Sequence, residues 1–367
     1  MRLTALVRGL PATVPFVGPE TQERRQGAPY RARLGANESV FGPSPQAVAA
    51  MARAAAEAWK YGDAQAHDLR VALAAHHGVA PENVLVGEGI DGLLGNLVRL
   101  LVAPGDPVVT SRGSYPTFGY HVAGFGGVMR AVPYRADRQD LDALQEAARE
   151  TGARLVYLAN PDNPMGGWFE AHDIAEFIAA LPGDTLLCLD EAYADFMDEG
   201  ALPPLDMDEA RVIRMRTFSK AHGLAGARVG YALGRLDLIA AFDRVRNHFG
   251  VGRISQAGAL AALEDRAWLS RVVADVNRSK TRLASIARAN GLTPLQSATN
   301  FVTMDCGRDG DFARRVLAEL GALGVFVRMP FVAPEDRCIR VTAGMDADLD
   351  VLETALPVAL SRAAEQG

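Results

Sequence analysis

Two short runs of consecutive apolar residues constrain the fold of this chain more than any other feature. They are residues 153–159, Ala-Arg-Leu-Val-Tyr-Leu-Ala, and residues 185–190, Thr-Leu-Leu-Cys-Leu-Asp. Such runs are typical of strands that are buried on both faces of a sheet. Helical patterns alternate with strand patterns, since residues 141–150 and 173–181 each favour a helix. The sequence therefore predicts an α/β fold whose large domain has a mostly parallel sheet covered by helices.

The alternation ends in the last third of the chain. A long helical stretch is expected over residues 256–290, and a strand is expected at residues 325–328. We interpret residues 247–367 as a smaller α+β domain and residues 37–246 as the large domain. Residues 1–36, rich in Pro, Gly and Arg, show little periodicity and are interpreted as an N-terminal arm.

Composition argues against several classes of protein. The formal charge of −6 over 367 residues is mild and does not suggest a nucleic-acid-binding protein, which would need a basic face. Cys188, Cys306 and Cys338 are far apart and form no Cys/His cluster, so we expect neither a metal site nor a disulfide framework. No apolar run approaches the roughly 20 residues that span a bilayer. We expect a cytoplasmic protein that binds neither membranes nor nucleic acid.

A Ser-Lys pair indicates the chemistry. Ser219 and Lys220 follow a strand-like run, and Arg228 lies eight residues beyond the lysine. A desolvated lysine amine is a nucleophile, and a planar guanidinium suits phosphate oxygens. The segment resembles the lysine motif of fold-type I pyridoxal-phosphate (PLP) enzymes. The resemblance implies that Lys220 forms the imine with the cofactor aldehyde, while Ser219 and Arg228 hold its phosphate.

Two further segments match the same family of enzymes. Residues 160–166 resemble the NPNNPTG turn of class I/II aminotransferases, which implies that Asn163 donates to the ring hydroxyl oxygen of PLP. Asp190 ends a buried strand, where a carboxylate is costly unless a cation meets it. The resemblance implies that Asp190 pairs with the protonated pyridine nitrogen of PLP, and protonation of that nitrogen makes the ring an electron sink. Tyr193 is assigned to the ring oxygen. The alternatives are that residues 160–166 form an ordinary turn and that Asp190 is a structural aspartate that caps the next helix.

The remaining cofactor contacts are weaker predictions. Residues 86–92 form a Gly-rich turn that runs into a helix, and helix N-termini bind phosphate well. By resemblance, the amides of Ile90 and Asp91 serve the phosphate. Phe118 is placed on the pyridine face, although an aromatic residue there could be plain core. Anchors at the carboxyl ends of strands fit the usual ligand position in open α/β sheets.

The resemblance extends over nearly the whole chain. Segments at residues 34–45, 61–70 and 338–344 are similar to histidinol-phosphate aminotransferase and its close relatives. This implies a homodimer in which Tyr61 reaches the neighbouring subunit's PLP phosphate. It also implies substrate binding by Asn37, by Arg340 and, nearby, by Arg328. An arginine presents a fork of donors that suits a carboxylate or phosphate.

The sequence thus predicts a PLP-dependent aminotransferase that exchanges an amino group with a 2-oxo acid, with glutamate and 2-oxoglutarate as the expected pair. An aromatic or other amino-acid substrate is the alternative, because Phe16 and Phe118 stand where histidinol-phosphate aminotransferases often have tyrosine. Two less favoured alternatives are a PLP decarboxylase of the same fold and a PLP-binding regulator without turnover. The full set of catalytic residues argues against the regulator: Asn163, Asp190, Tyr193 and Lys220.

Overall fold

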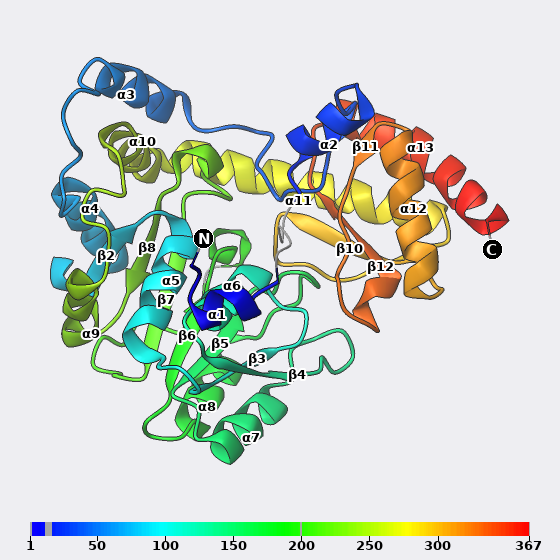
Figure 1. Ribbon diagram of the computed structural model, residues 1–367. Helices are drawn as coiled ribbons and strands as arrows, with labels where there is room; N and C mark the ends of the chain where they lie inside the picture. The colour runs from blue at the N-terminus through cyan, green and yellow to red at the C-terminus, as the bar shows by residue number, and fades with distance from the viewer. Residues whose placement is uncertain (1, 12–16, 199, 367) are drawn as a thin grey trace.

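A seven-stranded sheet forms the centre of the larger unit in the computed structural model, which describes residues 2–11, 17–198 and 200–366 (Figure 1). The strand order is β2-β8-β7-β6-β5-β3-β4. Strand β8 runs antiparallel to both of its neighbours, and the other pairs are parallel. The strands are β2 Val84–Gly87, β3 Pro107–Ser111, β4 Val128–Val132, β5 Leu155–Ala159, β6 Leu186–Asp190, β7 Val212–Thr217 and β8 Gly230–Leu233.

Helices cover both faces of this sheet. Alternate residues of a strand point to opposite faces of the sheet, so the hydrophobic core is divided between the two faces. Tyr157 and Met215 lie in the cluster under α5 and α6, while Val156 and Leu158 lie in the cluster under α7 and α8. These helices are α5 Gly89–Leu101, α6 Pro116–Gly124, α7 Leu141–Thr151 and α8 Ala171–Ala180. The predicted parallel sheet with two covered faces is confirmed.

The sheet end formed by β2 and β8 is covered by helices from distant parts of the chain. Helix α4 packs its Leu69 and Leu73 against Val86 of β2, and α10 adds Ala259 to the same cluster. Helix α10 thus lies beyond the expected boundary at residue 246 yet packs on the larger unit. The helices that complete this unit are α3 Pro45–Ala55, α4 His67–His77, α9 Leu236–Ala241 and α10 Arg253–Glu264.

Helix α11, Arg266–Ala289, carries the chain into a smaller unit with a three-stranded antiparallel sheet (Figure 1). Helices α12 Gly310–Ala322 and α13 Asp346–Glu365 pack on it. The small sheet consists of β9 Thr293–Pro294, β10 Phe301–Asp305 and β12 Cys338–Thr342.

Part of the N-terminal segment joins this smaller unit, namely α2 Pro19–Gln26 and β1 Ala32–Arg33. Helix α1, Ala5–Gly9, precedes them and is drawn in front of the larger unit (Figure 1). Strand β1 pairs in parallel with β11, Val325–Phe326, and Leu34 is fully buried in the core of the smaller unit. The strand expected at residues 325–328 is therefore shorter than predicted.

The helix expected over residues 256–290 is two helices. Asp265 ends α10, and its carboxylate accepts a hydrogen bond from the Trp268 amide at 3.2 Å, which caps the start of α11. An aspartate competes with helix continuation because its side chain bonds nearby main-chain amides. The apolar period continues across the break, so periodicity alone did not reveal it.

A buried ion triad holds β6 against β7 at the edge that carries the predicted anchors. The Glu191 side chain is fully buried, accepting from Arg214 Nε at 2.9 Å and from Arg216 Nε at 2.8 Å. Its own amide donates to the Met215 carbonyl at 2.8 Å. Glu191 directly follows Asp190, so these contacts fix the chain beside the Asp190 carboxylate.

Removing the central charge of this triad should destabilise the protein strongly. Glu191→Gln leaves two buried guanidiniums short of a counter-charge, and we expect a loss of about 3–5 kcal/mol in the free energy of unfolding. Glu353→Gln is the matched control, because Glu353 is 57% exposed and pairs with Arg282 at 2.8 Å on the surface. Its loss should stay below about 1 kcal/mol. Urea unfolding at equal cofactor occupancy compares the two variants, and equal losses would contradict the structural importance of the triad.

Candidate active site

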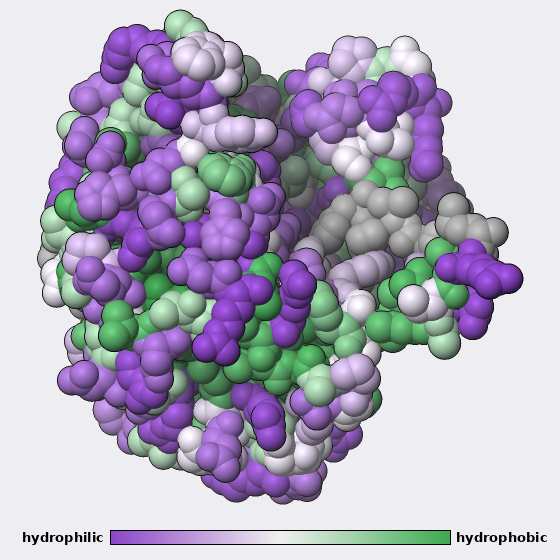
Figure 2. Space-filling view, turned by 60° about the vertical axis from the view of Figure 1, so that its left-hand side comes forward, coloured by the Kyte–Doolittle hydropathy of each residue, from purple (hydrophilic) through white to green (hydrophobic). Residues whose placement is uncertain are grey.

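A pocket of about 430 Å³ lies at the carboxyl ends of β5, β6 and β7 and is also lined by the smaller unit. In Figure 2 the surface is hollowed between the two units. Residues predicted for the site line the pocket from both sides. They are Asn37, Ile90, Asp91, Asn163, Asp190, Tyr193, Ser219, Lys220, Arg228, Arg328 and Arg340.

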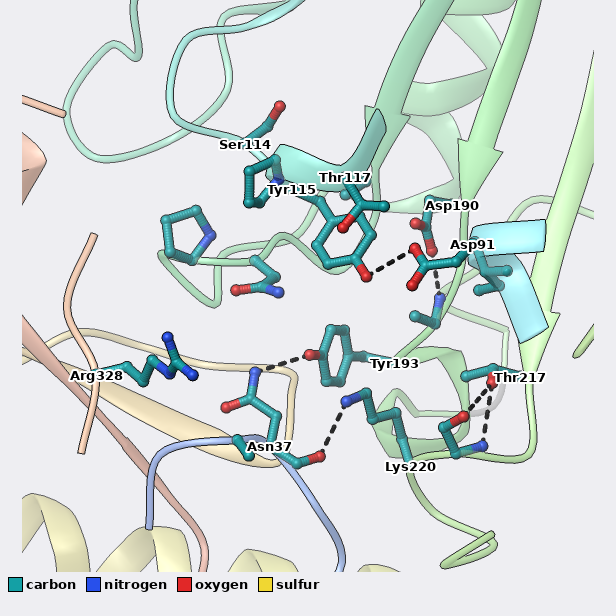
Figure 3. Close-up of a pocket in the computed structure, with 18 of the residues that line it drawn as sticks. Asn37, Asp91, Ser114, Tyr115, Thr117, Asp190, Tyr193, Thr217, Lys220 and Arg328 are labelled. Atoms are coloured by element: carbon teal, nitrogen blue, oxygen red, sulfur yellow. Dashed lines mark hydrogen bonds between the residues drawn. The ribbon is translucent and has the colours of Figure 1, made fainter. Parts of the chain in front are cut away.

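Lys220 lies in the turn after β7 and directs its amine into the pocket (Figure 3). Its Nζ donates to the Asn37 carbonyl at 3.0 Å and lies 5.6 Å from the centre of the Tyr193 ring. Burial, and secondarily the positive charge of Arg340, lowers the pKa of Lys220 to about 8. The lowered pKa raises the neutral fraction of the amine near neutral pH, and the neutral amine is the form that acts as a nucleophile or base.

Asn37 connects the lysine to the smaller unit. Its backbone is left-handed, with φ of 55°, and it is 2% exposed. Its Nδ2 donates to the Tyr193 hydroxyl at 2.9 Å, and its Oδ1 accepts from the Thr342 hydroxyl of β12 at 3.0 Å. Its carbonyl accepts from Asn300 as well as from Lys220. Asn37 thus joins residues of both units around the amine (Figure 3).

Asp190 ends β6 as a buried carboxylate with two defined donors. The Tyr157 hydroxyl donates to Oδ2 at 2.7 Å, and the Ala192 amide donates to Oδ1 at 3.0 Å. Burial raises the pKa of Asp190 to about 6, against the lowering effect of both hydrogen bonds. A cation in the pocket would stabilise the ionised carboxylate.

One corner of the pocket provides donors for an anion. The amides of Ile90 and Asp91 lie in the first turn of α5, and Arg228 Nη1 lies 3.4 Å from the Ser219 hydroxyl. A Cβ on Gly89, whose φ is +73°, would lie 2.5 Å from the Arg228 guanidinium. Only glycine leaves room for the arginine at this helix start. Helix amides, a guanidinium and a hydroxyl together suit a phosphate group.

The smaller unit supplies two arginines. Arg328 and Arg340 face each other through an isolated antiparallel bridge, and both line the pocket. Arg340 donates to the Asn163 side-chain oxygen and to the Gly35 carbonyl at 3.2 Å. Burial lowers the pKa of Arg340 to about 10. Arg328 donates to the Val17 carbonyl at 2.8 Å.

Two predicted residues lie elsewhere. Phe118 is 1% exposed and belongs to the core, where it stacks on Tyr157 at 4.5 Å between ring centres. It is not on the pocket wall, which does not fit the predicted contact with the cofactor ring, because its helix turns the side chain towards β5. Tyr61, which is predicted for the neighbouring subunit's site, is 79% exposed and packs on Phe249 outside this pocket. Phe16 lies outside the described residues.

Sequence reasoning missed other residues of the wall. Tyr115, Tyr157 and Thr217 line the pocket. Tyr157 is the one polar side chain in an otherwise apolar strand, and a buried tyrosine hydroxyl usually has a partner. The polar position of Tyr157 in this strand is therefore the sequence signal that predicts a hydrogen-bond partner for its hydroxyl. Tyr115, whose hydroxyl donates to Asp91 at 2.8 Å, lies three residues before Phe118 in the same segment (Figure 3).

The donor set fits PLP. Lys220 supplies an amine with a lowered pKa, and Asp190 supplies a buried carboxylate that a cation would stabilise. Tyr193 supplies a hydroxyl, and the corner at Arg228 supplies donors for a phosphate. The Arg340 side chain also lines the pocket, and its buried Nε has no hydrogen-bond partner among the described residues. Within the described ranges, no cluster of three acidic, His or Cys residues could hold a metal ion, and no helix is both long and apolar enough to cross a bilayer.

Comparisons with known proteins agree with this geometry. The family model of aminotransferase class I and II matches residues 32–356. The chain belongs to this family. The protein is a PLP-dependent aminotransferase, as predicted, that uses an amino donor and a 2-oxo acid.

Individual relatives of this aminotransferase carry two different names. It is 38% identical to a histidinol-phosphate aminotransferase of Anaeromyxobacter sp. over 92% of this chain and 93% of that protein. It is 35% identical to an aromatic amino acid aminotransferase of Mycolicibacterium paratuberculosis over 96% of both. Its structure matches that of histidinol-phosphate aminotransferase from Sinorhizobium meliloti in complex with pyridoxal-5'-phosphate. That match has a TM-score of 0.96 and 52% identity over 98% of both chains.

Reductive trapping should place the cofactor on Lys220. The chain has three lysines, Lys60, Lys220 and Lys280, so peptide mass analysis assigns the label directly. After PLP and borohydride treatment of cofactor-free protein, we expect one pyridoxyl group on Lys220. Labelling should rise with pH around a midpoint near 8, because the neutral amine reacts.

Lys280 is a matched control that shows whether labelling depends on the position of the lysine or only on its lowered pKa. Burial also lowers the pKa of Lys280 to about 8, but this residue lies outside the pocket wall and donates to the Ser297 carbonyl at 2.8 Å. Lys280→Arg should keep the label and Lys220→Arg should lose it. A label that persists in Lys220→Arg would contradict the assignment.

Proposed function

We propose that this aminotransferase acts on histidinol phosphate with 2-oxoglutarate as the amino acceptor. The observation that carries the proposal is the pair of arginines, Arg328 and Arg340, in one pocket with Lys220. A substrate with a phosphate at one end and an amine at the other suits this pocket, because the arginines can bind the phosphate while the amine lies near Lys220. The 52% identity to the Sinorhizobium meliloti enzyme supports the same substrate.

Lys220 is proposed as the residue that holds the cofactor and later moves a proton. PLP, when bound, supplies an electron-withdrawing ring that stabilises negative charge on the substrate α-carbon. The lowered pKa of Lys220 allows its neutral amine to take the proton from that carbon. The Asn37 carbonyl orients the amine before substrate arrives.

The other pocket residues have distinct proposed roles. Asp190 would pair with the ring nitrogen, and its buried carboxylate gains the counter-charge that it lacks among its neighbours. Asn163 and Tyr193 would donate to the ring oxygen. Ser219 and Arg228, with the Ile90 and Asp91 amides, would hold the phosphate. These positions leave the arginines of the smaller unit for the substrate.

Arg340 is proposed to bind the anionic end of each substrate in turn, with Asn37 forming the adjoining wall. Its Nε has no partner among the described residues, and Nη1 bonds Asn163 across the two units. A substrate anion at Arg340 would therefore also influence the loop that carries Asn163. Arg328 would add the second guanidinium that a more highly charged phosphate requires.

An aromatic substrate is the second candidate. Tyr115 and Phe331 line the pocket, and Phe331 is 56% exposed at its rim. Aromatic side chains favour a flat apolar group. The relative from Mycolicibacterium paratuberculosis, 35% identical, carries the aromatic name. The two arginines and the closer structural relative favour the phosphate ester.

Arginine variants should distinguish the two candidates. Arg328→Gln should lower kcat/KM for histidinol phosphate by about 10-fold to 100-fold, the value of one charge-assisted contact, and affect glutamate less. Arg340→Lys should impair both substrates, because a point charge replaces a fork of donors. Steady-state assays with histidinol phosphate, glutamate and phenylalanine make the comparison.

The control is Arg315→Gln. Arg315 lies on α12, outside the pocket wall, and donates to the Ala363 carbonyl at 3.0 Å. It should leave kcat/KM nearly unchanged for all substrates. Equal losses on every substrate in Arg328→Gln would refute its selective role. Turnover of phenylalanine without turnover of histidinol phosphate would favour the aromatic candidate.

We also propose that the protein acts as a homodimer with shared sites. Tyr61 is 79% exposed and packs against Phe249 with 40° between the ring planes, while Trp59 nearby is 81% exposed. Large exposed aromatic side chains in one segment favour a protein interface. In this arrangement Tyr61 would approach the phosphate corner of the neighbouring subunit.

Mixed dimers should test the shared site. Lys220→Ala and Tyr61→Ala proteins, each of low activity, are mixed under conditions that allow subunit exchange. One site of each hybrid then has both Lys220 and the neighbour's Tyr61, so about half of the sites of a hybrid regain function. Lys220→Ala mixed with itself is the control. Proven exchange without recovery would show that each site is built from one chain.

A further inference from the structure

We propose that Tyr157 is a positioning residue that fixes the Asp190 carboxylate for the cofactor ring. The inference rests on the proposed pairing of Asp190 with the ring nitrogen and extends it to the strand behind. It concerns a residue of β5 that contributes a single hydroxyl to the active site.

The geometry gives each carboxylate oxygen one fixed donor. The Tyr157 hydroxyl lies 2.7 Å from Oδ2 of Asp190, and the Ala192 amide lies 3.0 Å from Oδ1. A carboxylate oxygen has two lone pairs, so each oxygen retains acceptor capacity for a group in the pocket. Two donors at opposite oxygens determine the plane of the carboxylate.

The tyrosine itself is firmly held. Its ring is fully buried and stacks on Phe118 with 4.5 Å between ring centres and 17° between planes. Strand register places Ala159 beside Asp190, so Tyr157 lies two residues back on the neighbouring strand. The main chain therefore sets the distance between hydroxyl and carboxylate. Loss of the hydroxyl would leave one main-chain donor, and the side-chain torsion of an aspartate is otherwise soft.

The same hydroxyl affects ionisation. Burial raises the pKa of Asp190, and the charges of Asp91 and Glu191 act in the same direction. The Tyr157 hydrogen bond opposes them. Without it, the carboxylate holds a proton more strongly and is oriented less well. Both changes reduce protonation of a ring nitrogen that faces it.

The test compares three variants of the holoenzyme loaded with PLP that carries ¹⁵N in the ring. The ¹⁵N chemical shift of the resting enzyme reports ring-nitrogen protonation directly. Tyr157→Phe keeps the stacked ring and removes only the hydroxyl, so its signal should move towards the unprotonated value. Asp190→Asn should move it further in the same direction.

Tyr231→Phe is the matched control. Its hydroxyl is also buried and lies 3.0 Å from His77 Nε2, but Tyr231 is outside the pocket wall. This variant loses a similar interior hydrogen bond, and its ¹⁵N signal should match the parent. Turnover should agree: kcat should fall about 10-fold to 100-fold in Tyr157→Phe, with KM for the donor nearly unchanged.

The outcomes separate the inference from the function on which it rests. A parent-like ¹⁵N signal in Tyr157→Phe, with a shifted signal in Asp190→Asn, would overturn the role of Tyr157 alone. A parent-like signal in both variants would overturn the proposed role of Asp190. A fall in kcat or thermal stability without a change of signal would show that the hydroxyl is merely structural, which also overturns the inference.

Discussion

The parallel, in-register pairing of β5, β6 and β7 is the constraint on which the active site depends. Ala159, Asp190 and Met215 lie side by side across these strands. The chain leaves each strand at the same edge, so the Asn163 loop, the Asp190 carboxylate and the Lys220 turn converge. The residues that we propose to hold the cofactor therefore come from separate segments but share one rigid frame. The Glu191 triad strengthens this frame immediately beside Asp190.

A second set of contacts ties the frame to the smaller unit. Asn37 bonds Lys220 and Tyr193 on one side and Thr342 on the other. Arg340 adds a bond to Asn163. A displacement of the small sheet would consequently change the surroundings of the Lys220 amine as well as the part of the pocket wall that carries Arg340. The left-handed backbone of Asn37 is the local strain that this junction requires.

Much of the fold and the site could be predicted because the relevant information is local. The buried strands are continuous apolar runs, and the anchors follow them directly, as with Asp190 after β6. The break at Asp265 was missed, since apolar periodicity continues through it. The sequence predicts a ring contact for Phe118, yet Tyr115 lines the pocket and Phe118 does not, because sequence does not show which face of a helix meets the pocket. The Tyr157 hydrogen bond depends on strand register, which no local pattern specifies.

Strand β12 has a consequence for attempts to evolve new specificity. Arg340 and Thr342 are alternate residues of this strand: Arg340 lines the pocket, where we propose that it binds the substrate anion, and Thr342 donates to Asn37. Substitutions that shift β12 to accept another substrate would also shift the carbonyl that holds Lys220. We therefore expect substitutions in β12 that change specificity to affect turnover as well. Libraries that vary β12 together with residues 35–37 should yield active variants more often than libraries that vary either segment alone.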